Sequence, residues 1–438
     1  MTQPALPACL ATLALSFSLL LALPAQASTP APPQSAQTLF ERISPSVVEV
    51  VTKNRANLGR VSVASGFVTH RRDWVVTNYH AVDSAIFEAG SHVLNVVTSD
   101  GNSSNAELVA VDVVNDLAIL QVEGILDAPL LQLRETLPAK GEIGYSMGKP
   151  GSYQQGIVSG TFNGTSEKTA NTEIVFSGAI NAGMSGGPTL DAQGRVVGVN
   201  VATSTRHQLV GLAVPAEAVG QLIRRSNGAK PPTLQELRAD IARQLQANGR
   251  QILGRLDLPT HSVRRLGPFR VRGDLAKGTP CGIAQDHKNG DRFERLAQRC
   301  GNGDGIFVMD HQQAGRIYSG AFWIRSDSLG PAGLAKLVER QLNNLRDVND
   351  EDSPPGRWHC TEQRLRVTFD LPVQLHACRR AVQHLTGLFD YRFRYVPLID
   401  GPDALVGALG LTGFDDETAR SVLAKVLQTL RYTPEARP

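Results

Sequence analysis

Short hydrophobic runs separated by turn residues dominate the chain from Val47 to Val214. The runs are rich in valine and isoleucine and are too short and too evenly spaced for alternating strand and helix units. They predict an all-β domain, an antiparallel barrel or sandwich, preceded by a short helix over residues 36–43. The runs are SVVEVVT, RVSVASGFVTH, WVVTNY, HVLNVVT, AELVAVDVV, LAILQVE, EIGYSMG, QQGIVSGTF, TEIVFS, RVVGVNVAT and LVGLAVP.

The pattern turns helical after Pro215, first over residues 216–226 and then beyond the helix-breaking stretch NGAKPP. Thr233 and Glu236 have the spacing of a capping box, in which each side chain bonds the other's backbone N–H. Behind them, Leu234, Leu237, Ile241 and Leu245 fall on one helical stripe. We interpret residues 38–226 as one domain and residues 227–258 as a connector with an amphipathic helix.

The C-terminal part has a different composition and predicts an α+β unit with an approximate internal duplication. Cys281 and Cys300 recur as Cys360 and Cys378, 79 and 78 residues later, and the helical stretch LAKLVERQLNNLR has a counterpart, LAKVLQTLR, 89 residues later. The unequal offsets require an insertion in the second half. We expect two similar subdomains, 259–347 and 357–438, joined by an acidic linker, 348–356.

The first 27 residues resemble a signal peptide, because an uninterrupted apolar run ends in small residues before Ala27. The run has no Lys or Arg before it, and a membrane anchor or a buried helix is the alternative. We expect cleavage after Ala27, no stable membrane insertion afterwards, and a flexible tether over residues 28–37. The mature protein would be periplasmic or secreted.

Export implies an oxidising compartment, in which the four cysteines left after removal of the signal peptide are expected to pair. Four cysteines allow three pairings, and the simplest joins Cys281 to Cys300 and Cys360 to Cys378 across two loops of similar length. A metal site using these thiols with His359 or His376 is the alternative, but the spacing is not that of a zinc knuckle. We predict neither a metal nor a cofactor.

Composition narrows the class of partner. The 438 residues carry 44 basic and 41 acidic side chains, a formal charge of +3. This balance argues against nucleic acid or an anionic membrane as the main partner. Oligomerisation is left open.

Ser185 lies among three glycines in the stretch NAGMSGGP. Attack by a serine oxygen on a carbonyl requires open space and backbone N–H groups aimed at the developing oxyanion, and glycines leave both accessible. The sequence predicts Ser185 as a nucleophile, with the amides of Gly183 and Ser185 as its oxyanion hole. A glycine-rich turn without chemistry is the alternative.

A nucleophilic serine needs a base and a carboxylate that orients it. His80 lies three residues after the end of the predicted strand WVVT, and Asp116 directly precedes the apolar run LAIL. A carboxylate entering a buried strand needs a partner, and a histidine supplies one. Other candidates in this domain are the histidines His70, His92 and His207 and the carboxylates Asp83, Asp100 and Asp112, of which Asp112 is the runner-up.

The order of His80, Asp116 and Ser185 within TNYHAV, NDLAIL and AINAGMSGGP resembles the trypsin-like serine proteases, most closely the bacterial HtrA (high-temperature requirement) branch. The stretches ISPSVVEVV, ASGFV, GIVSG and GLAVP add to the resemblance, which covers about residues 38–226. It implies two six-stranded antiparallel β-barrels of the chymotrypsin-like kind, with the active site between them. It also implies peptide-bond hydrolysis through an acyl-enzyme, with polypeptides, including unfolded or misfolded proteins, as substrates.

Two departures from that family limit what the resemblance implies. Met184 precedes the serine where the HtrA branch usually has Asn, and residues 259–438 show no PDZ pattern. Regulation through PDZ domains is therefore not expected.

All of the residues that we expect to form the specificity pocket are uncharged. Ala179 stands where an acid would select Lys or Arg, and the expected walls are Val201, Ala202 and Ala213. These residues predict a preference for small aliphatic side chains, with a core role for the alanines as the alternative. The function predicted is an exported serine endopeptidase. The alternative is a latent barrel that serves as a binding or sensor protein through its C-terminal half.

Overall fold

The computed structural model describes residues 35–149, 153–166, 171–203, 210–228, 230–256, 263–275, 281–285, 292–303, 305–344 and 356–434. The predicted signal peptide, residues 28–34 of the predicted tether and residues 348–355 of the predicted acidic linker lie outside these ranges. No helix within the described ranges combines the length and the apolar composition needed to cross a membrane.

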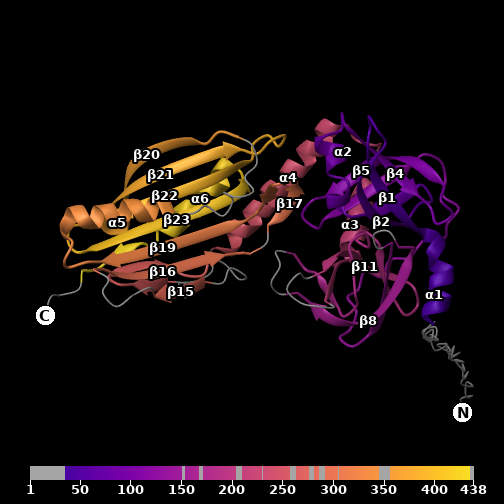
Figure 1. The fold of residues 1–438 in the computed structure, drawn as a ribbon, viewed down its shortest axis with the longest axis horizontal. Helices are drawn as coiled ribbons and strands as arrows, with labels where there is room; N and C mark the ends of the chain where they lie inside the picture. Colours follow the sequence, from indigo (N-terminus) through magenta and orange to yellow (C-terminus); the bar gives the residue numbers. More distant parts are fainter. Residues whose placement is uncertain are drawn as a thin grey trace, which may run out of the picture. The chain divides into compact units, whose positions relative to one another are not determined.

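The first part of the chain forms two closed antiparallel barrels, as predicted (Figure 1). The strand order is β1-β2-β3-β6-β5-β4 in the first barrel and β10-β11-β12-β9-β8-β7 in the second. The first barrel consists of β1 (Val47–Asn54), β2 (Arg60–Val68), β3 (Trp74–Thr77), β4 (His92–Val97), β5 (Ser103–Asp112) and β6 (Leu117–Val122). The second consists of β7 (Ile143–Gly148), β8 (Gly156–Thr165), β9 (Ile174–Phe176), β10 (Pro188–Asp191), β11 (Val196–Thr203) and β12 (Gly211–Pro215).

Residues on both faces of β1 are buried from Val47 to Thr52, which explains why valines occupy both alternating sets of positions in this strand. In β1, Val48 and Val50 join the core of the first barrel, whereas Val47 packs in a second cluster with Phe67 and Trp74. That second cluster also takes Leu39 and Ile43 from the lead helix α1 (Ala36–Ile43) and residues of α3 (Ala216–Ser226). Short helices η1 (Ser44–Ser46), η2 (Tyr79–Ala81) and α2 (Ser84–Phe87) fill the remaining turns.

The connector is a 22-residue helix, α4 (Leu234–Arg255). The predicted capping box is present, because Glu236 N–H donates to Thr233 Oγ1 and the Thr233 N–H donates to the Glu236 carboxylate. Leu237, Ile241 and Leu245 are buried in the core of the first barrel. Leu234, in the first turn, is 38% exposed and lies off this contact. The helix is therefore part of the barrel's packing.

The C-terminal part is built on one antiparallel sheet of seven strands in the order β15-β16-β19-β23-β22-β21-β20 (Figure 1). Its strands are β15 (Cys281–Gln285), β16 (Glu294–Gly301), β19 (Ile317–Arg325), β20 (His359–Val367), β21 (Leu371–Ala381), β22 (Phe389–Pro397) and β23 (Asp403–Phe414). Smaller elements are β13 (Val263–Leu266), β14 (Phe269–Arg272), β24 (Arg431–Tyr432), η4 (Thr368–Asp370) and the hairpin β17 (Ile306–Met309) and β18 (Gln312–Ala314).

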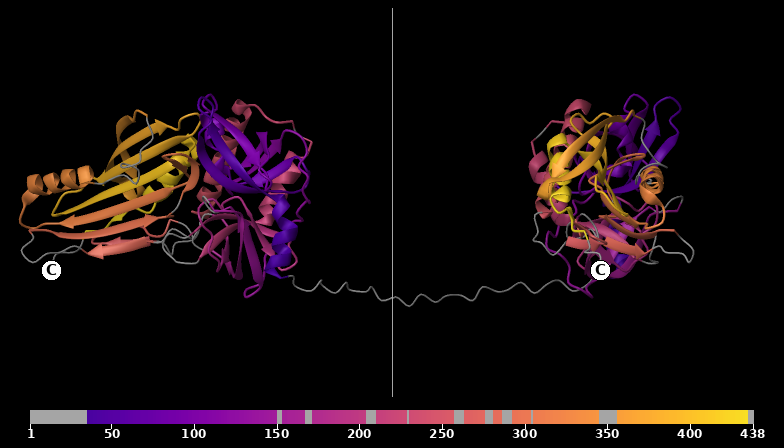
Figure 2. Two further views of the ribbon diagram at one scale, coloured as in Figure 1. Left: turned by 45° about the vertical axis from the view of Figure 1, so that its right-hand side comes forward. Right: turned by 90° about the vertical axis from the view of Figure 1, so that its left-hand side faces the viewer.

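The two segments predicted to be similar each give this sheet a disulfide-bridged hairpin and a closing helix. The helices are α5 (Gly330–Asn344) and α6 (Asp416–Leu427). Phe322 and Val406, which are register partners, pack with α5, whereas their neighbours Trp323 and Leu405 pack with α6. Successive residues of a strand point to opposite faces, so the two helices cover opposite faces of the sheet, as the right-hand view of Figure 2 shows.

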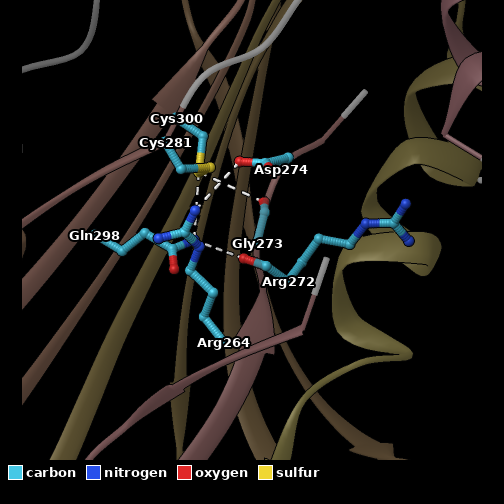
Figure 3. Close-up of a disulfide and its surroundings, with 7 residues drawn as sticks. All are labelled: Arg264, Arg272, Gly273, Asp274, Cys281, Gln298 and Cys300. Carbon is cyan, nitrogen blue, oxygen red and sulfur yellow. Dashed lines mark hydrogen bonds and ion pairs between the residues drawn. A yellow bond between two sulfur atoms is a disulfide. The ribbon is translucent and has the colours of Figure 1, made fainter. Parts of the chain in front are cut away.

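Both predicted disulfides are present, and each joins an edge strand to its neighbour. Cys281 in β15 pairs with Cys300 in β16, and Cys360 in β20 pairs with Cys378 in β21. Around the first bridge (Figure 3), Gln298 Nε2 donates to the Arg272 carbonyl at 2.6 Å, and Arg264 and Asp274 form an ion pair at 3.6 Å. The bridge itself contacts the segment that follows β14, because Cys300 Sγ lies 3.5 Å from the Gly273 carbonyl.

Candidate active site

His80 lies three residues after the end of β3, within the single turn of η2. Asn78 keeps an extended backbone there, and its side-chain amide donates to the Asp116 carbonyl at 2.8 Å. The Tyr79 N–H donates to the same carbonyl at 3.2 Å. These two bonds fix the histidine segment to the turn that carries the carboxylate.

Asp116 meets His80 at two points. Its Oδ2 lies 2.7 Å from His80 Nδ1, and its Oδ1 accepts the backbone N–H of His80 at 2.9 Å. Asp116 has a left-handed backbone with φ of 54°, a conformation that aspartate tolerates better than most residues. The side chains of His80 and Asp116 are 34% and 21% exposed, so the pair is shielded from solvent without being sealed.

Two opposing effects set the protonation of His80. Burial lowers the pKa of the imidazole, but the charge of Asp116 and its hydrogen bond raise it, and the charge of Asp83 adds to the rise. The net result is a pKa above the ordinary value of 6.5. A proton on Nδ1 held by Asp116 leaves Nε2 as the basic atom of the neutral ring.

Of the rival carboxylates, Asp112 and Asp100 are bonded to groups other than His80. Asp112 is buried and accepts both the backbone and the side-chain N–H of Asn115. Asp100 bonds Thr98 and Asn102 within its turn. Asp83 sits at the start of α2 without capping it through its side chain. The histidines His70 and His92 contact Trp74 and the Glu88 carbonyl respectively, and His207 lies outside the described residues.

The turn that carries Ser185 depends on glycine at two positions with positive φ, Gly183 at 91° and Gly186 at 84°. A Cβ on Gly186 would lie 2.1 Å from the Ser65 carbonyl oxygen and 3.1 Å from the backbone N of Asn78. The serine turn is thus packed directly against the segment that presents His80. Ser65 adds a second link, because its N–H donates to the Ser185 carbonyl at 2.8 Å and its Oγ donates to the Gly183 carbonyl at 2.7 Å.

Neither the Gly183 N–H nor the Ser185 N–H donates to another group among the described residues. The Met184 N–H, between them, bonds the Asn181 carbonyl at 3.0 Å. The two amides predicted as an oxyanion hole are therefore available to an incoming acceptor. The Ser185 hydroxyl donates to the Val201 carbonyl at 2.6 Å, which is a contact other than the predicted one with the imidazole.

Asn200 supports this turn and was not singled out by the sequence analysis. Its side-chain amide donates to the Met147 and Met184 carbonyls at 3.0 and 3.1 Å and accepts from the hydroxyls of Ser146 and Thr189. Its carbonyl accepts the Gly186 N–H at 2.8 Å. A lone amide inside the apolar run VVGVNVAT was the available signal, because a buried polar side chain must find partners.

The residues predicted to form the specificity pocket are only partly placed. Ala213 is fully buried in the core of the second barrel together with Met184, so these two side chains pack inside the barrel. Ala179 and Val201 are partly buried, and the side chain of Ala202 lies outside the described residues. The walls of a pocket thus stay a prediction.

The alternative of a metal bound by the cysteines meets a chemical obstacle. Cys360, His376 and Cys378 lie close together, with Cys378 Sγ 3.7 Å from the His376 ring nitrogens. Both sulfurs are joined in a disulfide, and metal ligation requires free thiolates.

Part of this chain is similar in sequence to a known family of proteins. Residues 64–199 match the family of trypsin-like peptidase domains. The chain is 29% identical over 351 residues to "Protease Do-like 1, chloroplastic" of Arabidopsis thaliana, covering 68% of this chain and 76% of that protein. It is 32% identical over 202 residues to "Serine protease HTRA1B" of Danio rerio, covering 43% of this chain and 40% of that protein.

A third relative is the "Probable periplasmic serine endoprotease DegP-like" of Bartonella henselae, 30% identical over 200 residues, covering 43% of this chain and 38% of that protein. The chain thus spans about two fifths of the length of the second and third relatives, and the similarity to them is confined to part of it.

Proposed function

We propose that this chain is an exported serine endopeptidase, which hydrolyses peptide bonds through an acyl-enzyme. The match to trypsin-like peptidase domains and the similarity to HtrA-type proteases support this proposal. In this proposal Ser185 is the nucleophile, His80 the general base and then the general acid, and Asp116 the group that orients His80. The amides of Gly183 and Ser185 stabilise the oxyanion.

The observation that carries the proposal is the two-point contact of Asp116 with His80, next to the serine turn. A carboxylate on Nδ1 holds the imidazole in the tautomer whose Nε2 can accept a proton. The second bond, from the backbone N–H of His80, fixes the carboxylate relative to the ring. A merely structural glycine-rich turn would not require this arrangement beside it.

The reaction begins with a rotation of the Ser185 hydroxyl away from the Val201 carbonyl and toward Nε2 of His80. The imidazole removes the hydroxyl proton while Oγ attacks the scissile carbonyl, whose oxygen becomes the oxyanion. The free N–H groups of Gly183 and Ser185 receive that charge, and losing one such donor costs about 2.7–4 kcal/mol of transition-state stabilisation. The imidazolium then donates its proton to the leaving amine.

Water completes the cycle. His80, now neutral, deprotonates a water molecule that attacks the acyl-enzyme ester, and the imidazolium returns the proton to Ser185 Oγ as the acid product leaves. Every proton taken by His80 is thus released within one turnover. This chemistry needs only the side chains and backbone amides named above.

The test is labelling and turnover of the full chain. A fluorophosphonate probe should add one mass increment to the wild type, and Ser185→Ala should abolish it and lower kcat by about 10⁶-fold. Ser159→Ala, an exposed serine of the second barrel, is the matched control and should leave both unchanged. Labelling of Ser185→Ala equal to that of the wild type would refute the proposed nucleophile.

Substrates and location follow from the same proposal. We propose polypeptides, including unfolded ones, with small aliphatic residues on the acyl side, because no charged side chain is expected at the pocket. The disulfides and the periplasmic or chloroplastic names of the relatives support a periplasmic or secreted location. Efficient cleavage after Lys or Arg in a peptide library would contradict the pocket.

One observation favours a second candidate function, a latent barrel that acts as a binding or sensor protein. The Ser185 hydroxyl is bonded to the Val201 carbonyl, so the nucleophile must leave a hydrogen bond before it can react. A latent protein would react with the fluorophosphonate probe at the rate of an ordinary serine and would show no peptide hydrolysis over hours.

A further inference from the structure

The hairpin formed by β17 and β18, residues 306–314, belongs to the C-terminal part in sequence but packs with the first barrel. Ile306, Val308 and Ala314 are buried in the same hydrophobic cluster as Val48, Val50 and Tyr79. Residues of α4 and the segment 382–388 complete this cluster. The hairpin is therefore part of the core on which the histidine segment rests.

Two contacts place the hairpin at the candidate active site itself. The buried hydroxyl of Tyr79, the residue before His80, donates to the Val308 carbonyl at 2.5 Å. The ring of Phe307 meets the His80 imidazole edge to face, with centroids 6.3 Å apart and planes at 85°. Phe307 also meets the Tyr79 ring at 6.4 Å. A residue 227 positions beyond the histidine thus borders the imidazole.

The base of the hairpin is fixed to the seven-stranded sheet. Gly315 N–H donates to the Thr412 carbonyl at 2.7 Å, and Gln312 Nε2 in β18 donates to the Asp390 carboxylate at 3.5 Å. Asp390 is itself held by a fully buried ion pair with Arg380 at 2.8 Å. Because the hairpin is bonded to the sheet through Gly315 and Gln312 and to Tyr79 through Val308, it holds Phe307 beside His80.

Phe307 borders the imidazole without sealing it. The His80 side chain is 34% exposed despite the ring, and Phe307 is itself only partly buried. A side chain that plugged the site would bury the imidazole. An aromatic ring at the margin of an accessible imidazole instead offers an apolar surface to whatever lies on that imidazole.

We propose that Phe307 is a specificity-determining residue of the peptidase, supplied by the C-terminal half, which binds an apolar side chain of the substrate next to the His80 imidazole. This inference rests on the proposed function, since it assigns a binding surface to that same site. It gives the hairpin a direct role in substrate choice.

Two acids, Asp83 before α2 and Asp310 in the hairpin turn, favour an apolar over an acidic side chain at this position. Burial raises the pKa of Asp83 to about 7, the Ser84 N–H counteracts this, and the charge of Asp310 in the hairpin turn adds to the rise. Asp83 also senses the charge of His80. Two acids near His80 thus already disfavour each other's charge, and a substrate carboxylate there would be disfavoured in the same way, whereas an apolar side chain would not.

The experiment compares peptide libraries randomised at each of the two positions on either side of the cleaved bond. We expect the wild type to prefer apolar residues over glycine at one of these positions. Phe307→Ala should lower that preference, the ratio of the two kcat/KM values, by about 10-fold, as expected for loss of part of an apolar contact. Phe369→Ala, which removes an 84% exposed phenylalanine on η4, is the matched control and should leave the ratio unchanged.

Two results would overturn the inference. An unchanged ratio in Phe307→Ala would overturn the inference, and so would a uniform increase in kcat/KM for all peptides, because it would identify the ring as a cover. If Phe307→Ala fails to fold, Phe307→Leu keeps an apolar side chain there and should show a smaller loss of the same preference. Failure of the proposed function is a different result: the wild type itself would neither cleave peptides nor be labelled at Ser185.

Discussion

The Asp116 carboxylate binds His80 through two different atoms, the ring Nδ1 at 2.7 Å and the backbone N–H at 2.9 Å. One contact sets the tautomer of the ring, and the other sets the position of the carboxylate relative to the chain. A substitution that removes only the negative charge of Asp116 should therefore change the tautomer of His80 while keeping the side chain at position 116 in place.

Asp116→Asn should keep the backbone contact and lower kcat by about 10⁴-fold, because an amide facing Nδ1 favours the wrong tautomer. Asp112→Asn is the matched control at the rival carboxylate, and its kcat should stay within a few-fold of the wild type. The measurement is kcat on one peptide substrate together with the melting temperature. Comparable losses of kcat in both variants would remove Asp116 from its proposed role.

The pH profile should report the raised pKa of His80. The base must be neutral to act, so kcat/KM should fall as the pH is lowered through that pKa. Because the pKa lies above 6.5, the midpoint of the acidic limb should also lie above 6.5. In Asp116→Asn, burial then lowers the pKa unopposed by that carboxylate, and the midpoint of the residual activity should move to lower pH. A midpoint that stays in place would assign the limb to another group.

Gly186→Ala should damage the serine turn far more than its backbone conformation alone explains. Gly101 has nearly the same φ, 88° against 84°, but a Cβ there would meet nothing within 4 Å. Gly101→Ala should therefore cost only the conformational term, about 1–2 kcal/mol. Gly186→Ala adds a clash with the Ser65 carbonyl and should also abolish probe labelling of Ser185. Equal melting temperatures in the two variants would contradict the close packing.

The barrels should not be stable without the rest of the chain. A protein of residues 35–226 lacks Leu237, Ile241, Ile306 and Val308, which complete the core of the first barrel. Burying such a side chain is worth about 1.5–3 kcal/mol, so the total loss rivals the stability of a whole domain. We expect no cooperative thermal unfolding of the shorter protein, whereas the full chain should unfold cooperatively. A cooperative transition at the same temperature in both would show that the barrels are autonomous.

Much of the fold could be predicted because its signals are local. The helix over residues 36–43, the capping box of Thr233 and Glu236, and the eleven apolar runs all correspond to observed elements. β10 was missed because it has four residues, begins with Pro188 and lies within a glycine-rich stretch. Proline cannot donate to a ladder and is therefore not a signal for a strand interior.

The rest of the site depends on contacts between distant segments. The bond from Tyr79 to Val308 joins residues separated by 229 positions, and no periodicity in either segment indicates it. The rotamer of Ser185 and the placement of Met184 inside the second barrel likewise follow from packing. The sequence indicates which residues carry chemistry, whereas these contacts decide how they are presented.

The two outermost strands of the seven-stranded sheet, β15 and β20, are each bonded covalently to the next strand. A protease is exposed to cleavage by other copies of itself. A strand of a sheet must first detach as an extended segment before it can be cleaved. Because a disulfide holds each edge strand to its neighbour, this protein should resist self-digestion until the two disulfides are reduced. Incubation with and without a thiol reductant, followed by mass spectrometry, should show new cleavage points in these margins only after reduction, and none in the presence of a serine-directed inhibitor.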